Sequence, residues 1–168
     1  MNSYTTFDSP LGQILLVSDG SLLTGVYFSG QKYEPEPGPG WRREPDLGIF
    51  QDASLQLREY FAGRRRQFDL PLHLRGTPFQ MKVWNALLEI PLGSTVSYGE
   101  LAGRIMRKDA VRAVGAAVGR NPVSVIVPCH RVIGSGGPLT GYAGGLERKR
   151  ALLDLEEAVL AGITHLPH

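Results

Sequence analysis

Over the first 30 positions, runs of apolar and strand-forming residues are divided by turn residues, which predicts the strands of a small sheet. Strand character is found at residues 4–7, 13–17 and 22–28. Asp19-Gly20 separates the second stretch from the third and favours a hairpin, because both residues tolerate a positive φ. The next stretch, 34–45, is so rich in Pro and Gly that it predicts a mobile surface loop.

A helix and a further strand complete the predicted N-terminal half. Residues 46–62 carry an imperfect apolar stripe at helical spacing, and Gly63 is a natural helix end. Apolar and polar residues alternate over 68–74, which predicts a half-buried strand, and Pro71 places that strand at a sheet edge. His73 stands alone and is interpreted as structural. This half therefore offers no group of residues suited to chemistry.

Capping boxes mark two helix starts in the second half of the chain, which we expect to begin after residue 75. Each pairs a hydroxyl residue with Gln or Glu three positions later: Thr77 with Gln80, and Ser97 with Glu100. The first helix is expected to reach Pro91, and the second is expected to run through Ile105.

A third helix should follow a tight turn, with Asp109 as its cap and Val118 near its end. The second and third helices together have the outline of a helix-turn-helix. Small residues such as Ala113 and Gly115 line the third helix, and Arg112 stands out among them. Such a face suits tight packing on a neighbouring helix, or a helix that lies in a narrow DNA groove.

The only cysteine of the chain, Cys129, follows a short apolar run. Residues 123–127 predict a buried strand, with proline-containing turns on both sides. A lone cysteine is commonly a small hydrophobic core residue, whereas a thiol at the end of a rigid element is well placed for chemistry. His130 comes next, but neighbours on an extended chain point apart, so it would act through a bend or a bridging water.

Several ordered motifs carry a family resemblance. They are Pro128-Cys129-His130-Arg131-Val132, Ser97-Tyr98-Gly99-Glu100-Leu101-Ala102, Arg112-Ala113-Val114-Gly115, Asn121-Pro122, Gly141-Tyr142-Ala143-Gly144-Gly145-Leu146 and Glu156. With them, residues 77–156 resemble the O6-alkylguanine-DNA alkyltransferases, which repair DNA by taking alkyl groups onto a cysteine. The resemblance implies an α/β protein of two domains. Residues 1–75 would form a ribonuclease-H-like small sheet with a helix, and residues 76–168 a winged-helix-like domain with the helix-turn-helix.

The resemblance implies a catalytic set around Cys129. A water would link the thiol to His130, Glu156 would hold the imidazole, and Asn121 would act as a hinge beside the DNA-binding helix. The position of Glu156 gives independent support, because it lies on the apolar face of the last predicted helix and a buried acid needs a partner. A salt bridge with Lys149, seven residues earlier on the same face, is the alternative.

The resemblance also assigns contacts with DNA. The substrate contacts that it implies are Tyr98, Val132, Tyr142, Ala143 and Lys149, and the DNA contacts are Ser97, Arg112, Ala113 and Gly115. Arg112 would intercalate through the minor groove, while Tyr98 would help to rotate the target guanine out of the duplex. Without the resemblance, Arg112 could equally form a surface ion pair and Tyr98 could be a core aromatic residue.

The implied reaction is an irreversible, stoichiometric transfer from O6-alkylguanine, with O4-alkylthymine as a second candidate substrate. No cofactor is expected, because guanine itself is the leaving group. A non-catalytic lesion-recognition protein is one rival, although such relatives lack the reactive cysteine. A cysteine hydrolase is another, although no oxyanion-hole pattern supports it. The number of alkyl groups transferred per molecule would separate the three functions: none, one or many.

Charge and composition agree with a DNA partner. The net charge of the 168 residues is +2, but residues 76–150 carry 10 basic and 4 acidic side chains. A single cysteine excludes an internal disulfide and a Cys-rich zinc site, and favours a reducing compartment. No apolar run is long enough for a membrane span, and the N-terminus lacks the layout of a signal peptide. We expect a cytoplasmic monomer without membrane contact, with cooperative assembly on DNA left open.

Overall fold

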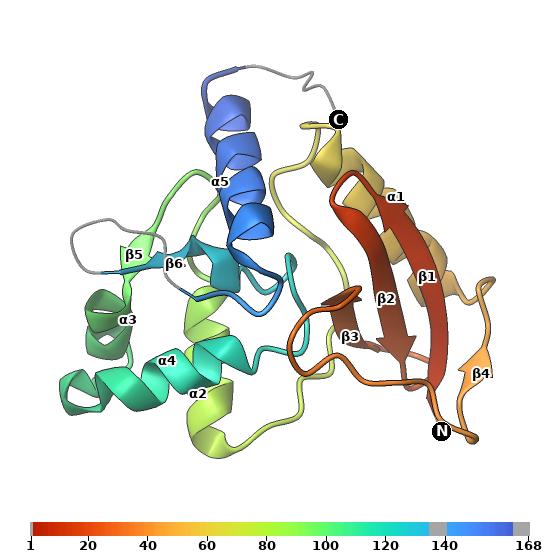
Figure 1. The fold of residues 1–168 in the computed structure, drawn as a ribbon, viewed down its shortest axis with the longest axis horizontal. Coiled ribbons are helices and arrows are strands. Elements are labelled where there is room, and N and C mark those ends of the chain that lie inside the picture. Colours follow the sequence, from red (N-terminus) through yellow and green to blue (C-terminus); the bar gives the residue numbers. More distant parts are fainter. Residues whose placement is uncertain (1, 135–140, 163–168) are drawn as a thin grey trace.

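The computed structural model describes residues 2–134 and 141–162, so the end of the predicted C-terminal domain, 163–168, lies outside the described residues. The first part is a four-stranded sheet in the order β3-β2-β1-β4 (Figure 1). Its strands are β1 (Ser3–Ser9), β2 (Gly12–Ser18), β3 (Leu23–Phe28) and β4 (Arg42–Arg43).

The antiparallel pairing of β1, β2 and β3 confirms the three strands predicted from runs of strand-forming residues between turns. The turn at Asp19 joins β2 to β3, and His73 contacts the Asp19 carboxylate at 3.1 Å. The predicted loop over 34–45 is partly wrong, because β4 pairs in parallel with β1. A strand of two residues is too short to leave a periodic signal in the sequence.

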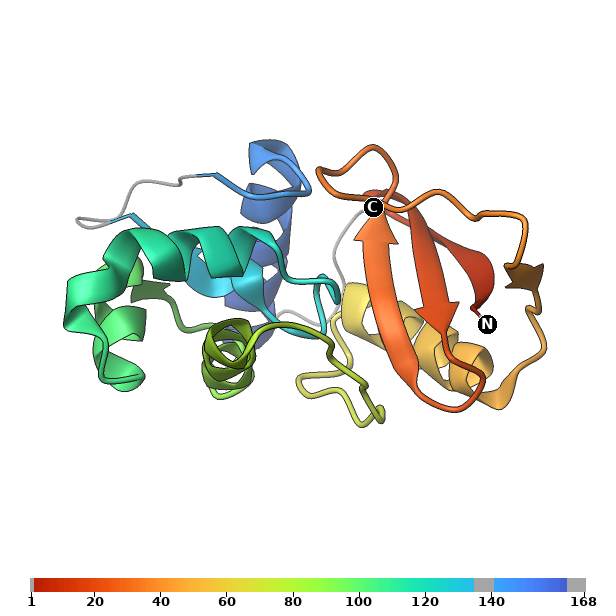
Figure 2. The same cartoon turned by 90° about the horizontal axis from the view of Figure 1, so that it is seen from below.

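Helix α1 (Gly48–Phe61) covers one face of this sheet (Figures 1 and 2). Gly63, with a φ of 75°, ends it as predicted, because the left-handed conformation suits glycine. The prediction of a strand over 68–74 is wrong, but the prediction that this segment lies at the edge of the sheet is confirmed. Only Leu72 makes a bridge, in parallel with Leu23 on β3, while its neighbours are extended without a ladder.

The second part is built from helices α2 (Pro78–Leu87), α3 (Tyr98–Arg104), α4 (Val111–Gly119) and α5 (Leu146–Leu160). Both predicted capping boxes are confirmed, one at Thr77 and one at Ser97. The prediction that Asp109 caps the third helix is wrong. Asp109 lies within a short 3-10 helix, η1 (Lys108–Ala110), and the first turn of α4 has no side-chain cap. This 3-10 turn separates Asp109 from the start of α4, so its carboxylate is not at the capping position.

The predicted buried strand over 123–127 is also wrong. Only Val123 makes a bridge, to Val26 on β3, and the residues after it turn back on themselves. The side chain of Asn121 accepts from the backbone N–H of Val123 at 3.0 Å and donates to the carbonyl of Val127 at 2.8 Å. The Asn121 side chain thereby occupies a backbone N–H and a backbone carbonyl that would otherwise be hydrogen-bonded to a neighbouring strand. The run is apolar because it is buried, and not because it is extended.

The sheet and the helical part share one buried core, which runs from Ile14 on β2 to Val159 on α5. Helix α5 lies where the two parts meet (Figures 1 and 2). Strands β5 (Val96–Ser97) and β6 (Val132–Ile133) pair in parallel beside it. Within the described ranges, no helix combines the length and the apolar character needed to cross a bilayer.

Candidate active site

Tight turns lead the chain to Cys129. Val125 has a φ of 72°, which is rare for a β-branched residue and marks a strained turn. Pro128 then adopts a φ of −82° and a ψ of 64°, an inverse γ-turn in which Cys129 N donates to the carbonyl of Val127 at 2.8 Å. The thiol therefore begins a 3-10 helix, η2 (Cys129–Arg131), and does not follow a strand.

The thiol of Cys129 is buried, and its surroundings keep it protonated. Burial raises the pKa of Cys129 to about 11, although the Asn121 side chain and the charge of Lys149 favour the thiolate. Lys149 is itself buried, and burial lowers its pKa to about 8 against the effect of Cys129. Its amino group donates to the carbonyl of Val132 at 2.6 Å. A nucleophile with so high a pKa needs a base that takes its proton as it reacts.

Glu156 is the centre of a buried polar network. Its carboxylate accepts from the Tyr60 hydroxyl at 2.6 Å and from Arg131 Nε and Nη2 at 2.8 and 2.9 Å. His130 Nε2 lies 2.6 Å from the same carboxylate. Burial alone would raise the pKa of Glu156, but His130 and Arg131 outweigh it and hold that pKa well below its usual range.

Because Glu156 is ionised, Nε2 of His130 carries the proton of their short hydrogen bond. Nδ1 of His130 is buried and has no hydrogen-bond partner among residues 2–134 and 141–162. In the neutral ring this atom holds a lone pair and can accept a proton. The contact that the sequence predicted between Glu156 and His130 is thus present. The alternative partner, Lys149, binds Val132 instead, and Arg131 supplies the cation at Glu156.

Sequence reasoning missed Tyr60 and Arg131. The sequence places Tyr60 on the apolar stripe predicted for residues 46–62, and it shows Arg131 only as a member of the cysteine motif. The sequence does hold a signal for Arg131. Apolar residues precede and follow the cysteine motif, which indicates that the motif is buried, and a buried arginine requires an acid as its partner.

Cys129 opens on a cavity of about 660 Å³ that brings predicted substrate residues together. Its walls include Tyr98 of α3, Gly115 of α4, and Tyr142 and Ala143 of the loop before α5. Burial, and after it the charge of Cys129, raise the pKa of Tyr142, so its hydroxyl stays protonated beside the thiol. The cavity therefore joins an aromatic lining to a nucleophile.

The α3–α4 pair has the predicted helix-turn-helix outline, with η1 between the helices. Arg112 and Ala113 are exposed at the start of α4, whereas Val114 and Ala117 face the core. Arg112 makes no ion pair with any residue that the structure describes, which removes the alternative explanation for it. The hydroxyl of Ser97 is used within the protein, since it accepts from Glu100 N at 3.0 Å.

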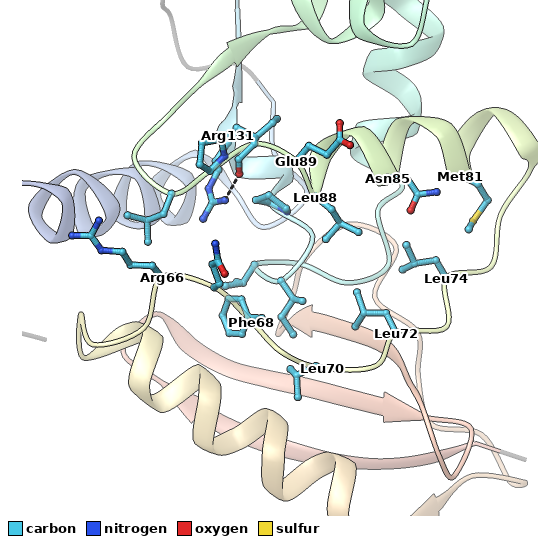
Figure 3. Close-up of a pocket in the computed structure, with 17 residues that line it drawn as sticks. Arg66, Phe68, Leu70, Leu72, Leu74, Met81, Asn85, Leu88, Glu89 and Arg131 are labelled. Atoms are coloured by element: carbon cyan, nitrogen blue, oxygen red, sulfur yellow. Dashed lines mark hydrogen bonds between the residues drawn. The ribbon is translucent and has the colours of Figure 1, made fainter.

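A second, larger cavity of about 800 Å³ lies between the 66–74 segment and α2 (Figure 3). Its lining combines apolar side chains such as Leu70, Leu72 and Leu88 with polar ones, and Arg131 lies at one side. Arg131 Nη1 donates there to the carbonyl of Ile90. Cys129 does not line this cavity, so the space that matters for the thiol is the smaller one.

Comparisons with known proteins match two family models to this chain. Residues 2–74 match the family model described as "6-O-methylguanine DNA methyltransferase, ribonuclease-like domain". Residues 78–158 match the model described as "6-O-methylguanine DNA methyltransferase, DNA binding domain". The implied ribonuclease-like and DNA-binding parts of the fold are thereby confirmed.

Relatives of high identity extend over nearly the whole chain. The methylated-DNA–protein-cysteine methyltransferase of Mycobacterium tuberculosis is 54% identical over 158 residues, which cover 94% of each chain. The protein of that name from Haemophilus influenzae is 47% identical over 155 residues, 92% of this chain and 86% of its own. The crystal structure of Mycobacterium tuberculosis OGT in complex with DNA matches with a TM-score of 0.88, at 50% identity and over 94% of both chains. The chain belongs to the 6-O-methylguanine DNA methyltransferase family.

Proposed function

We propose that this protein repairs DNA directly, by moving an alkyl group from O6 of guanine onto Cys129. One observation supports this most strongly: Cys129 opens on an aromatic cavity and is followed directly by the buried His130–Glu156 pair. A nucleophile, a base and a residue that orients the base are the parts that a covalent transfer needs. The relatives are named for transfer from methylated DNA to a protein cysteine.

The proposed step exchanges one bond for another. The sulfur of Cys129 bonds to the alkyl carbon while the bond from that carbon to O6 breaks, and the electron pair stays on guanine. The thiol proton passes through a water to Nδ1 of His130, and Glu156 stabilises the imidazolium that forms. The guanine anion takes up one proton as it leaves, and His130 gives up the proton that it received from the thiol, so the net change moves one proton from sulfur to guanine. The thioether is stable, which makes the reaction irreversible and limits each molecule to one transfer.

The cavity residues would hold the flipped guanine. We assign the Tyr98 hydroxyl and the backbone N–H of Ala143 to the base, and Tyr142 to its aromatic wall. The carbonyl of Val132 would accept the amino group of guanine, and Lys149 fixes that carbonyl through its 2.6 Å hydrogen bond. Asn121, whose side chain is hydrogen-bonded to both ends of the 123–127 segment, would couple this pocket to the end of α4.

DNA would lie against α3 and α4. We propose that α4 enters the minor groove with Ala113 and Gly115 at its closest approach, and that Arg112 fills the space left by the flipped base. Ser97, at the start of α3, would contact the backbone. Small side chains suit a narrow groove, where sequence preference is low.

The proposal extends to the oligomeric state, the location and the domain division of the protein. We propose that the protein acts on double-stranded DNA as a monomer in the cytoplasm, and cooperative assembly on long DNA is a separate outcome to measure. We further propose that residues 1–75 and 76–168 are its two domains. The extended stretch before the Thr77 cap supports that division.

A duplex with one labelled O6-methylguanine tests the function. We expect one methyl group per protein molecule, found by peptide mass spectrometry on Cys129. The control variant Cys129→Ser should keep its affinity for DNA and take up no label, because affinity comes from contacts outside the thiol. Binding without transfer by the wild-type protein would indicate a lesion-recognition protein, and repeated turnover would indicate a hydrolase.

A further inference from the structure

The cavity that holds Cys129 has a wall that comes from the sheet domain. Lys32 and Tyr33, which follow β3, line it opposite residues of the helical part. Arg120, the residue after α4, lines it as well. The N-terminal half therefore reaches the mouth of the reactive pocket, although nothing in its sequence suggested a part in the reaction.

These three side chains form a small cationic cluster around one aromatic ring. The guanidinium carbon of Arg120 lies 4.1 Å from the centre of the Tyr33 ring, and Nζ of Lys32 lies 5.3 Å from it. Tyr33 is 51% exposed. The ring attracts both cations through its negative face. Two like charges held at one ring repel each other, and an anion bound between them would relieve that repulsion.

No acid among the described residues neutralises these two cations. Neither Lys32 nor Arg120 has an ion pair among the residues that the structure describes. Glu34 is near in sequence, but its carboxylate accepts from the backbone N–H of Gly30 at 3.0 Å. The two cations are thus available to an anion from outside.

The segment that carries this cluster is held firmly. The buried side chain of Gln31 accepts from Phe28 N at 2.7 Å and from the Ser124 hydroxyl at 3.2 Å. Lys32 N donates to the carbonyl of Ala143, a cavity residue, at 3.0 Å. Tyr33 has a φ of 66°, a costly conformation that persists only where the surroundings impose it. The cations are therefore pre-organised at a fixed distance from the pocket.

The chemistry of the substrate identifies the anion. A nucleotide that enters the cavity stays attached to the strand through one phosphate on each side, so a phosphate must lie at the cavity mouth. We propose that Lys32, Tyr33 and Arg120 form a rim that binds a backbone phosphate next to the flipped nucleotide. This inference rests on the proposed function and extends DNA contact to the sheet domain.

The salt dependence of binding gives the first test. Duplex affinity is measured over a range of salt concentrations in the Cys129→Ser background, where no transfer occurs. Each phosphate contact that is lost should reduce the slope of log K against log salt by about 0.9. We expect that full reduction for Lys32→Ala combined with Arg120→Ala, because the rim binds one phosphate, and a smaller reduction for Lys32→Ala alone. Arg120→Lys keeps the charge and should keep most of the slope.

Arg64→Ala is the matched control, because Arg64 is an exposed arginine that does not line the cavity. Its slope should equal that of the parent protein. Melting temperatures are recorded for every variant, and Lys32→Ala, a change at an exposed loop residue, should melt as the parent does. An unchanged slope in the folded double variant would overturn the proposal.

Neutral phosphates in the DNA locate the contact. A methylphosphonate is placed on either side of O6-methylguanine, one position at a time. At one of these positions we expect the parent and the double variant to bind equally, since the partner of the rim is then absent. A difference that persists at both positions would contradict the assignment. Transfer of label by the wild-type protein is scored separately, so the rim can fail while the proposed function stands, and the reverse.

Discussion

The hydroxyl of Tyr60 lies 2.6 Å from a carboxylate oxygen of Glu156, and the two residues are 96 positions apart along the chain. Tyr60 belongs to α1 of the sheet domain, and Glu156 belongs to α5. Burial, followed by the charge of Glu156, raises the pKa of Tyr60, so the hydroxyl remains a donor. The sheet domain therefore supports the residue that orients His130.

Replacing Tyr60 with Phe should destabilise the protein by about 1–3 kcal/mol, because one donor to a buried carboxylate is lost. Urea unfolding measures this. The transfer rate should fall as well, since Glu156 then holds His130 less firmly. Tyr4→Phe, a partly buried tyrosine in β1, is the control and should change neither quantity. Equal stability of Tyr60→Phe and wild type would show that Arg131 alone holds the carboxylate.

Glu156→Gln should slow transfer per folded molecule and lower stability in a pH-dependent way. The pKa of Glu156 is depressed on folding, so its stabilisation is present above its unfolded pKa of about 4.3 and is lost as pH falls below that value. Removing one member of a buried ion pair costs about 3–5 kcal/mol at neutral pH.

The measurement is the free energy of unfolding of both proteins from pH 7 down to pH 3. The difference between wild type and Glu156→Gln should shrink on the acidic side of pH 4. A constant difference over the whole range would show that the charge of Glu156 contributes nothing to stability.

The thiol of Cys129 should lose its proton only at high pH. With a pKa of about 11, the free protein should show thiolate absorbance at 240 nm only above pH 10, well beyond the ordinary cysteine range. The difference between wild-type and Cys129→Ser spectra removes the contribution of the tyrosines. A midpoint below pH 8 would mean that the thiol is activated before substrate binds, and the base role of His130 would then be unnecessary.

Arg112→Ala should weaken repair of duplex DNA much more than reaction with free alkylated guanine. Arg112 would stabilise the flipped state of the duplex, and it takes no part in bond formation. The ratio of the two second-order rates measures the effect, with Arg64→Ala as control. Equal losses on both substrates would point to a structural role for Arg112.

Methylated protein should melt at a lower temperature than the free form. Cys129 is only 4% exposed, and a methyl group that displaces buried neighbours of the sulfur costs roughly 1–3 kcal/mol. In a protein of this size each kcal/mol lowers the melting temperature by about 2–4 °C. Melts before and after stoichiometric reaction test this, and larger alkyl groups should widen the gap. An adduct as stable as the free protein would show that the cavity absorbs the group.

Short-range patterns in the sequence determined the regular elements. The strands β1 to β3 follow from short runs of strand-forming residues between turns, and the capping boxes at Thr77 and Ser97 involve partners only three residues apart. Those interactions form within one segment, so the segment itself carries the information. The motif over 128–132 places His130 directly after Cys129, whereas the contact of His130 with Glu156, 26 residues away, was implied by the family resemblance.

Only the tertiary structure decided which distant groups meet. No residue close to Tyr60 in the sequence indicates that its partner is a carboxylate. Arg131 contacts Glu156 only because η2 packs against α5. The apolar run over 123–127 was read as a strand, yet the Asn121 side chain takes its backbone partners. Burial and extension leave the same apolar pattern, and hydrogen bonds formed on folding distinguish between them. The cationic rim likewise exists only because the segment after β3 docks beside the end of α4.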